Sequence, residues 1–189
     1  GAGTTGKNFS IDWDKITPDF ITFGKTLTSG YVPLSIIITK KNYLYKIKDK
    51  FGSILLPSST YQGHSLGVAA ALGAQKIVNN SEFLSGVSKK GIYLRNTIKN
   101  ELGSLDFFNN VRGRGMRNSL EFASPNNEIF SEKIRNNALN QHKLILNARW
   151  HRVCFSPAIN IQYSDLDIMI EKFVKTYKFV ISNWTKYNK

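Results

Sequence analysis

Residues 19–25 read Asp-Phe-Ile-Thr-Phe-Gly-Lys, and residues 30–33 read Gly-Tyr-Val-Pro. The run 20–23 has the character of a strand that is buried on both faces, and Gly24 ends it. An amine on the turn after such a strand is costly to desolvate, and burial lowers its pKa until it can act as a nucleophile. Lys25 is therefore a candidate for Schiff-base chemistry. The alternative is an ordinary lysine whose amine reaches solvent at a strand end.

The composition predicts a folded protein with a sizeable core, in one domain or two small ones. The chain has 189 residues, of which 41% are hydrophobic. Its single cysteine, Cys154, excludes an internal disulfide framework and suits a reducing compartment. We expect no membrane span and no signal peptide, because no apolar run is long enough and the first residues lack a basic-to-apolar order. These features together predict a cytoplasmic protein.

The net charge of +13 favours anionic partners. The densest basic run spans residues 40–50 and is interleaved with Tyr43 and Tyr45, a pattern that could stack on a nucleic-acid strand. We favour the solvated face of a helix over nucleic-acid binding, because the lysines are spread along the whole chain. No pattern of metal ligands was found.

Residues 1–7 read Gly-Ala-Gly-Thr-Thr-Gly-Lys and match the phosphate-loop pattern G-x-x-x-x-G-K in form. That motif needs a Ser or Thr next, where this chain has Asn8, and it needs a strand before it. We therefore expect no nucleotide loop here.

Apolar periodicity and stop signals predict the other elements. Helices are expected at 42–50, 65–79, 81–102, 131–141 and 164–186, and strands at 34–38, 111–122, 144–146 and within 149–161. Ser81 and Ser164 are the predicted N-caps of the helices that they begin. In the strand near the end of the chain, Arg152 and Cys154 should share one face, with Val153 and Phe155 on the other.

Five segments occur in the order typical of one enzyme family. They are residues 1–7, residues 18–33, the segment Ser58-Ser59-Thr60-Tyr61-Gln62-Gly63-His64, the arginine- and glycine-rich residues 111–122, and residues 155–161. Together they resemble the class III (omega-type) aminotransferases, which depend on pyridoxal 5′-phosphate (PLP). The resemblance implies an α/β protein of PLP fold type I. Residues 1–80 would be the C-terminal part of the PLP-binding large domain, and residues 81–189 the small α+β C-terminal domain with its linking helix.

The same resemblance implies roles for individual residues. Lys25 would be the catalytic lysine that forms the Schiff base with PLP. Thr60, with Ser59 beside it, would contact the PLP phosphate of the neighbouring subunit in a homodimer. His64 is expected to be structural.

The family's substrate-binding arginine is displaced in this chain. Aligned on Phe155 and Pro157, its position is occupied by Cys154. Arg152 lies two residues earlier on the same strand face and could hold a substrate carboxylate from about 6–7 Å further along. A surface role for Arg152, or a substrate without that carboxylate, remains open, and Trp150 and His151 could line the pocket.

The resemblance covers only the C-terminal half of such an enzyme. The half that would precede Gly1 carries the phosphate-binding turn and the aspartate that pairs with the cofactor's ring nitrogen, and neither Asp12 nor Asp19 matches that aspartate. We therefore expect a PLP-dependent aminotransferase that transfers an amino group between an amine or amino acid and a keto acid or aldehyde, and that needs an N-terminal half. The alternatives are a non-catalytic remnant, a related PLP decarboxylase, racemase or aminomutase, and a basic nucleic-acid-binding module.

Overall fold

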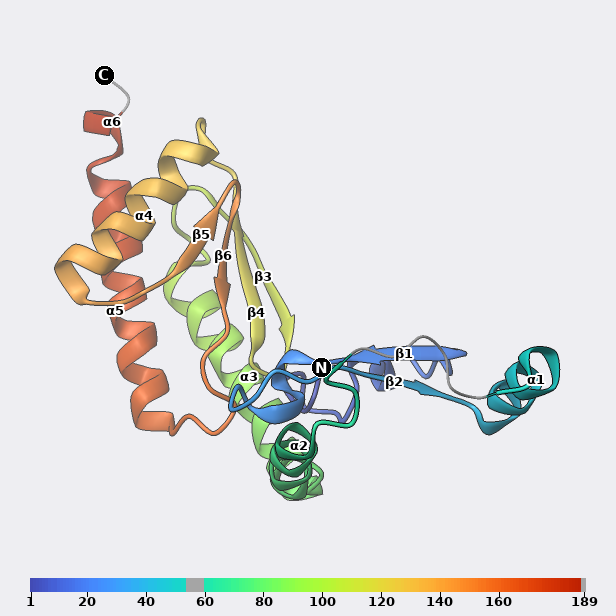
Figure 1. The fold of residues 1–189 in the computed structure, drawn as a ribbon. Helices are drawn as coiled ribbons and strands as arrows, with labels where there is room; N and C mark the ends of the chain where they lie inside the picture. Colours follow the sequence, from blue (N-terminus) through green and yellow to red (C-terminus); the bar gives the residue numbers. More distant parts are fainter. Residues whose placement is uncertain (54–59, 188–189) are drawn as a thin grey trace. The chain divides into compact units, whose positions relative to one another are not determined.

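The computed structural model of the chain describes residues 1–53 and 60–187, which form two compact units (Figure 1). Unit 1 comprises Gly1–Gly3 and Lys7–Leu84, and unit 2 comprises Thr4–Gly6 and Ser85–Lys189. The division falls inside helix α3 (Ser81–Leu102). None of the helices in the described ranges is long and apolar enough to cross a membrane.

Unit 1 is built on a two-stranded antiparallel sheet. Strand β1 (Phe20–Phe23) pairs with β2 (Ile36–Thr39), and Phe23 lies opposite Ile36. The expectation of burial on both faces is wrong for these strands, since Phe20 is 52% exposed and Ile37 is 69% exposed. The physical reason is that side chains point to the two faces of a sheet, and the described residues leave both faces of this two-stranded sheet largely uncovered.

Unit 1 also contains four helices, which precede, separate or follow the two strands in the sequence. They are the 3₁₀-helices η1 (Ser10–Trp13) and η2 (Lys25–Thr28) and the α-helices α1 (Lys41–Phe51) and α2 (Ser65–Val78). Helix α1 ends at Gly52, which adopts a left-handed φ of 73°. None of its residues is buried, and Lys41 and Lys46 lie over the rings of Tyr45 and Tyr43. The basic run is therefore a solvated helix face, as predicted.

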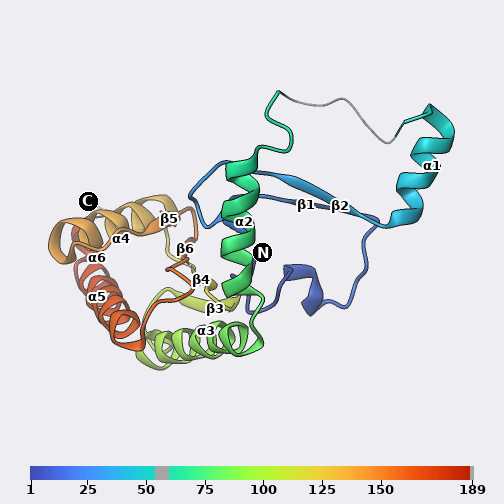
Figure 2. The ribbon, with the colours of Figure 1, turned by 60° about the horizontal axis from the view of Figure 1, so that its bottom comes forward.

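Unit 2 is a four-stranded antiparallel sheet with helices along one side (Figure 2). Strands β3 (Phe108–Arg114), β4 (Arg117–Phe122), β5 (Asn147–Arg149) and β6 (Arg152–Phe155) lie in the order β3-β4-β6-β5. The helices are α3, α4 (Asn127–His142), α5 (Tyr163–Ser182) and the short α6 (Trp184–Tyr187). Their apolar faces and the inner sheet face form one core, which includes Leu94, Ile98, Leu120, Phe130, Phe155, Phe173 and Tyr177.

Several predicted boundaries in unit 2 need correction. Residues 111–122 form most of a hairpin, with its turn at 115–116, instead of one strand. The third strand of the sheet in sequence order is Asn147–Arg149, because that segment finds a partner in β6, whereas the predicted strand 144–146 does not. Helix α3 is capped by the Asn80 side chain, which accepts a hydrogen bond from the Phe83 N–H, and α5 begins after Gln162 instead of at Ser164.

Residues Thr4–Gly6 pack against the β3–β4 turn within unit 2. The Met116 N–H donates to the Thr4 carbonyl at 2.9 Å, and Thr4 and Thr5 are buried. Gly115 has a φ of 52°, and a Cβ there would lie 2.5 Å from the Thr5 carbonyl carbon. Because the next helical element after Lys7 is the 3₁₀-helix η1, this segment lacks the α-helix that a phosphate loop requires.

Candidate active site

Lys25 is the first residue of η2, directly after β1 and Gly24. Gly24 is extended, and a Cβ there would lie 3.3 Å from the Leu34 carbonyl oxygen. Lys25 has a φ of 53°, in the left-handed region that residues with a side chain adopt uncommonly, as do six other non-glycine residues of the described chain. Its side chain is exposed, so the burial from which we expected its reactivity is not provided by the described residues.

Three hydrogen bonds and two buried residues hold the turn that carries Lys25. Leu27 and Thr28 are buried, and the Thr28 hydroxyl donates to the Val32 carbonyl at 2.6 Å. The Gln75 side-chain amide of α2 donates to the Leu27 carbonyl at 3.2 Å. The Leu27 N–H in turn donates to the Gly24 carbonyl at 3.1 Å. A fixed turn therefore presents an accessible amine.

Thr60 lies in the turn that precedes α2, and Ser59 lies outside the described residues. The His64 Nδ1 accepts a hydrogen bond from the Gly67 N–H at 3.3 Å and so caps α2, which is the structural role predicted for it. Gln75, which holds the Lys25 turn, lies about 15 Å along the helix from Ser65. No hydrogen bond joins Lys25 to Thr60 in the described chain, so the structure leaves these two candidates on separate segments of unit 1.

Arg152 lies on β6 in unit 2. The predicted alternation is confirmed, because Val153 and Phe155 are buried while Arg152 and Cys154 are half-buried on the other face. Arg152 and Cys154 line a surface hollow of about 130 Å³, together with Asn147, Arg149 and Trp150. The hollow thus contains both the candidate arginine and the cysteine that occupies the expected arginine position.

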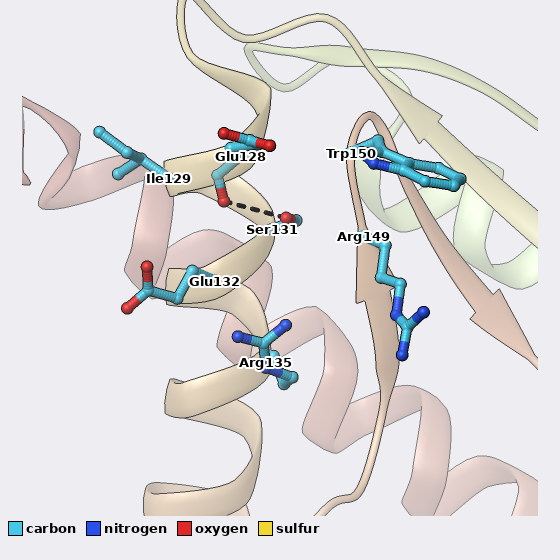
Figure 3. A pocket seen from close by; sticks show the side chains of 7 residues that line it. All are labelled: Glu128, Ile129, Ser131, Glu132, Arg135, Arg149 and Trp150. Carbon is cyan, nitrogen blue, oxygen red and sulfur yellow. Dashed lines mark hydrogen bonds between the residues drawn. The ribbon is translucent and has the colours of Figure 1, made fainter.

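A second and larger hollow adjoins the same hairpin (Figure 3). Its volume is about 410 Å³, and it is lined by Glu128, Ile129, Ser131, Glu132 and Arg135 of α4 and by Arg149 and Trp150. Figure 3 shows the two hairpin side chains on one side and the five helix side chains on the other. Trp150 lines both hollows, whereas His151 lines neither.

The chain matches the family model for class-III aminotransferases over residues 1–177. The chain belongs to the class-III aminotransferases. Members of this family depend on PLP. The fold is that of PLP-dependent aminotransferases, as the sequence predicted.

Two curated relatives show how much of such a protein this chain spans. It is 28% identical over 185 residues to the acetylornithine/succinyldiaminopimelate aminotransferase of Buchnera aphidicola subsp. Acyrthosiphon pisum (strain APS), covering 96% of this chain and 43% of that protein. It is 32% identical over 135 residues to the acetylornithine aminotransferase of Bacillus subtilis (strain 168), covering 70% of this chain and 32% of that one. The chain thus spans less than half the length of these relatives.

Solved structures of aminotransferases have the same fold as this chain. A transaminase from the marine bacterium Virgibacillus superposes with a TM-score of 0.89 at 24% identity, covering 97% of this chain and 44% of that one. The Plasmodium falciparum ornithine δ-aminotransferase superposes with a TM-score of 0.79 at 28% identity, covering 97% and 45%.

The described residues fit PLP in part. Lys25 offers an exposed amine on a fixed turn, and Thr60 offers a hydroxyl before a helix start, where phosphates bind well. Neither Asp12 nor Asp19 matches the family's aspartate in sequence, and each accepts a hydrogen bond within unit 1. Asp12 accepts from the Phe9 N–H, and Asp19 accepts from the Tyr43 hydroxyl, a hydrogen bond that raises the pKa of Tyr43. In the described part of the chain no three metal-ligating side chains gather.

Sequence reasoning missed two features of these sites. One is the left-handed backbone of Lys25, for which a single sequence has no marker, since lysine has no preference for that region. The other is Arg149, which lies directly opposite Arg152 in the β5–β6 ladder. Recognising the two-residue loop at 150–151 would have revealed that pairing.

Proposed function

We propose that this chain is the C-terminal part of a PLP-dependent aminotransferase that moves an amino group between an amine or amino acid and a keto acid or aldehyde. Lys25 is the covalent attachment point for the cofactor in this proposal. One observation carries it: within a class-III aminotransferase match, an exposed lysine with a φ of 53° stands on an anchored turn directly after a strand. The Schiff base expected of Lys25 belongs to this proposal.

Lys25 has a second role, as the group that moves a proton. PLP, when bound, supplies an electron-withdrawing ring that makes a proton on the substrate carbon removable. The Lys25 amine accepts that proton as a general base and returns it as a general acid. A flexible four-carbon side chain on a fixed backbone suits both positions, because the amine can shift while its anchor stays in place.

Thr60 and Arg152 are the proposed binding residues. The Thr60 hydroxyl contacts the cofactor phosphate, with Ser59 beside it in the sequence, and this contact is made to the neighbouring subunit of a homodimer. Arg152 holds a substrate carboxylate through its planar guanidinium, which matches the two oxygens of such a group. Support for Arg152 comes from its half-buried place in a hollow next to Cys154.

The catalytic unit is proposed to include a further, N-terminal half. The chain spans 43% of its Buchnera relative, and neither Asp12 nor Asp19 matches the aspartate that pairs with the ring nitrogen in this family. Residues 1–80 are assigned to the large domain and residues 81–189 to the small domain. The complete unit is proposed to work as a homodimer in the cytoplasm, for which the free Cys154 is suited.

The names of the relatives indicate the class of donor. They include acetylornithine, ornithine and diaminobutyrate aminotransferases, whose named substrates are aliphatic amino acids. We propose a donor of this kind, with an amine at one end and a carboxylate for Arg152 at the other.

A reconstituted complex tests this proposal. The chain is co-expressed with the N-terminal half of the Buchnera relative, and the purified complex is examined for retained PLP and its absorbance above 400 nm. Lys25→Ala should abolish that absorbance, while Lys48→Ala, at an exposed lysine of α1, should leave it unchanged. An assembled complex that retains the same absorbance after Lys25→Ala would overturn the assignment.

A further inference from the structure

The β5–β6 hairpin places two arginines against each other. Arg149 and Arg152 are directly opposite in the antiparallel register, and the two-residue loop of Trp150 and His151 joins them. Directly opposite side chains have Cβ atoms about 4.5–5.5 Å apart, and like charges in such a pair are destabilising. The hairpin therefore carries a repulsion that a negative charge between the guanidinium groups would relieve.

The nearest carboxylate along the sheet is already engaged. Glu121 lies opposite Arg152 on the β4 side, and its Oε1 accepts two hydrogen bonds from Arg112, at 2.6 and 2.8 Å. Neither Arg149 nor Arg152 forms an ion pair with any of the residues that the structure describes. Both guanidinium groups of the hairpin thus lack an ion-pair partner in the described part of the chain.

The loop that joins these arginines exposes the aromatic residue Trp150, whose backbone adopts an unfavourable conformation. Trp150 has a φ of 53°, a conformation that two-residue hairpin loops usually give to Asn or Gly. Trp150 is 58% exposed, and the centre of its ring lies 5.6 Å from the Arg152 guanidinium carbon. A bulky residue held in this region is an outlier, and such outliers point to sites of function.

The hollows make the same hairpin accessible to a small molecule. The 130 Å³ hollow is lined by both arginines, by Trp150 and by the amide of Asn147, and so combines charge, an apolar wall and a polar group. The larger hollow shares Arg149 and Trp150 with it and is also lined by α4, where Arg135 adds a third guanidinium and Glu128 and Glu132 add two carboxylates (Figure 3).

We propose that Arg149, Arg152 and Trp150 form a binding site for an oxyanion, either a carboxylate or a phosphate group. The anion lies between the two guanidinium groups, and the Trp150 ring excludes water from one side. Where the oxyanion is a substrate carboxylate, the inference deepens the role proposed for Arg152 and rests on it, with Arg149 as a further specificity-determining residue. Binding of the anion itself requires no PLP.

The test is a titration of the 189-residue chain without cofactor. Inorganic phosphate is added in one arm and glutarate in the other, at constant ionic strength set with KCl, and binding is followed by calorimetry and by tryptophan fluorescence. We expect saturable binding in at least one arm, and the arm that saturates identifies the anion class. Arg149→Gln and Arg152→Gln should each weaken that binding about tenfold or more, since each removes charged hydrogen-bond donors.

The control variant is Lys99→Gln, which removes one exposed positive charge from α3 of the same unit. It should leave the affinity within about twofold of the unmodified chain, because the charge lies on another element and is screened by the added salt. Circular dichroism of all three variants checks that they are folded. Saturation in neither arm, or equal binding by the two arginine variants and the control, would overturn the oxyanion site. A failed PLP assay would not affect this result.

Discussion

The side-chain amide of Gln75 donates a hydrogen bond to the backbone carbonyl of Leu27 at 3.2 Å, across 48 residues of sequence. Leu27 is two residues beyond Lys25 and is buried, so this contact fixes the turn on which the candidate catalytic amine stands. The position of Lys25 therefore depends on α2, a helix whose own side chains contribute no catalytic group to the proposal.

Gln75→Ala should loosen this turn. Loss of the hydrogen bond leaves a buried carbonyl unpaired, and we expect the free energy of unfolding to fall by about 1 kcal/mol. Urea denaturation measures it, with faster amide exchange expected at Leu27 and Ser29, whose N–H groups donate within the turn. Gln141→Ala, at an exposed position of α4, is the matched control and should change stability by less than about 0.5 kcal/mol. Equal effects of the two variants would contradict the anchoring role.

Gly115→Ala should be severely destabilising. Its φ of 52° is unfavourable for alanine, and the new Cβ would lie 2.6 Å from the Thr4 carbonyl oxygen, which is backbone and has little freedom to move. We expect a loss of about 3 kcal/mol or more. Gly86→Ala in α3 should have the opposite effect. Alanine favours a helix more than glycine does, and nothing lies within 4 Å of the added Cβ, so the free energy of unfolding should rise by about 0.5–1 kcal/mol. Thermal unfolding of both variants checks this, and a stable Gly115→Ala chain would refute the tight packing.

Stability should decline in alkali through Tyr177. Burial, followed by the charge of Asp106, raises the pKa of Tyr177 well above its ordinary value of 10.0. A raised folded-state pKa means that the folded chain retains a proton that the unfolded chain releases. The stabilising contribution is therefore complete below pH 10 and is lost as the pH rises above it.

Urea denaturation between pH 8 and pH 11 measures this slope. Tyr177→Phe should reduce the alkaline decline, while costing about 1 kcal/mol at neutral pH through loss of the hydrogen bond from its hydroxyl to the Asp106 carbonyl. An unchanged alkaline slope in Tyr177→Phe would show that other groups cause the decline.

Arg112 should influence the proposed oxyanion site without lining it. Arg112→Gln releases Glu121, which lies opposite Arg152 and can then pair with it. Because an internal carboxylate would compete with the added anion, we expect affinity for the saturating anion to fall about threefold to tenfold. Arg112→Gln combined with Glu121→Gln should restore it. Affinity that is unchanged in Arg112→Gln would show that Glu121 does not reach Arg152.

Much of the fold follows from local pattern. Helix α3 has the predicted bounds because Phe83, Val87, Leu94 and Ile98 repeat at helical spacing and Gly103 follows the last turn. The alternation of β6 is equally local and was predicted correctly.

Features that depend on a distant partner were not predictable in this way. The apolar run 144–146 resembles a strand, but strand pairing begins at Asn147, opposite Cys154, and register is not encoded in one strand. Asn80 and Ser81 are both good caps, and only the structure shows that Asn80 makes the bond. Likewise, Lys25 was identifiable by its motif, while its exposure depends on what covers β1.

The most direct test of the central claim is peptide mapping of the assembled, PLP-loaded complex after reduction with borohydride. Reduction fixes a lysine-bound cofactor permanently, and a modified Lys25 resists trypsin. We predict that the cofactor's mass appears on a peptide spanning residues 16–40, uncleaved after Lys25. Cofactor bound in that complex with its mass on another lysine, and with cleavage after Lys25 intact, would contradict the account.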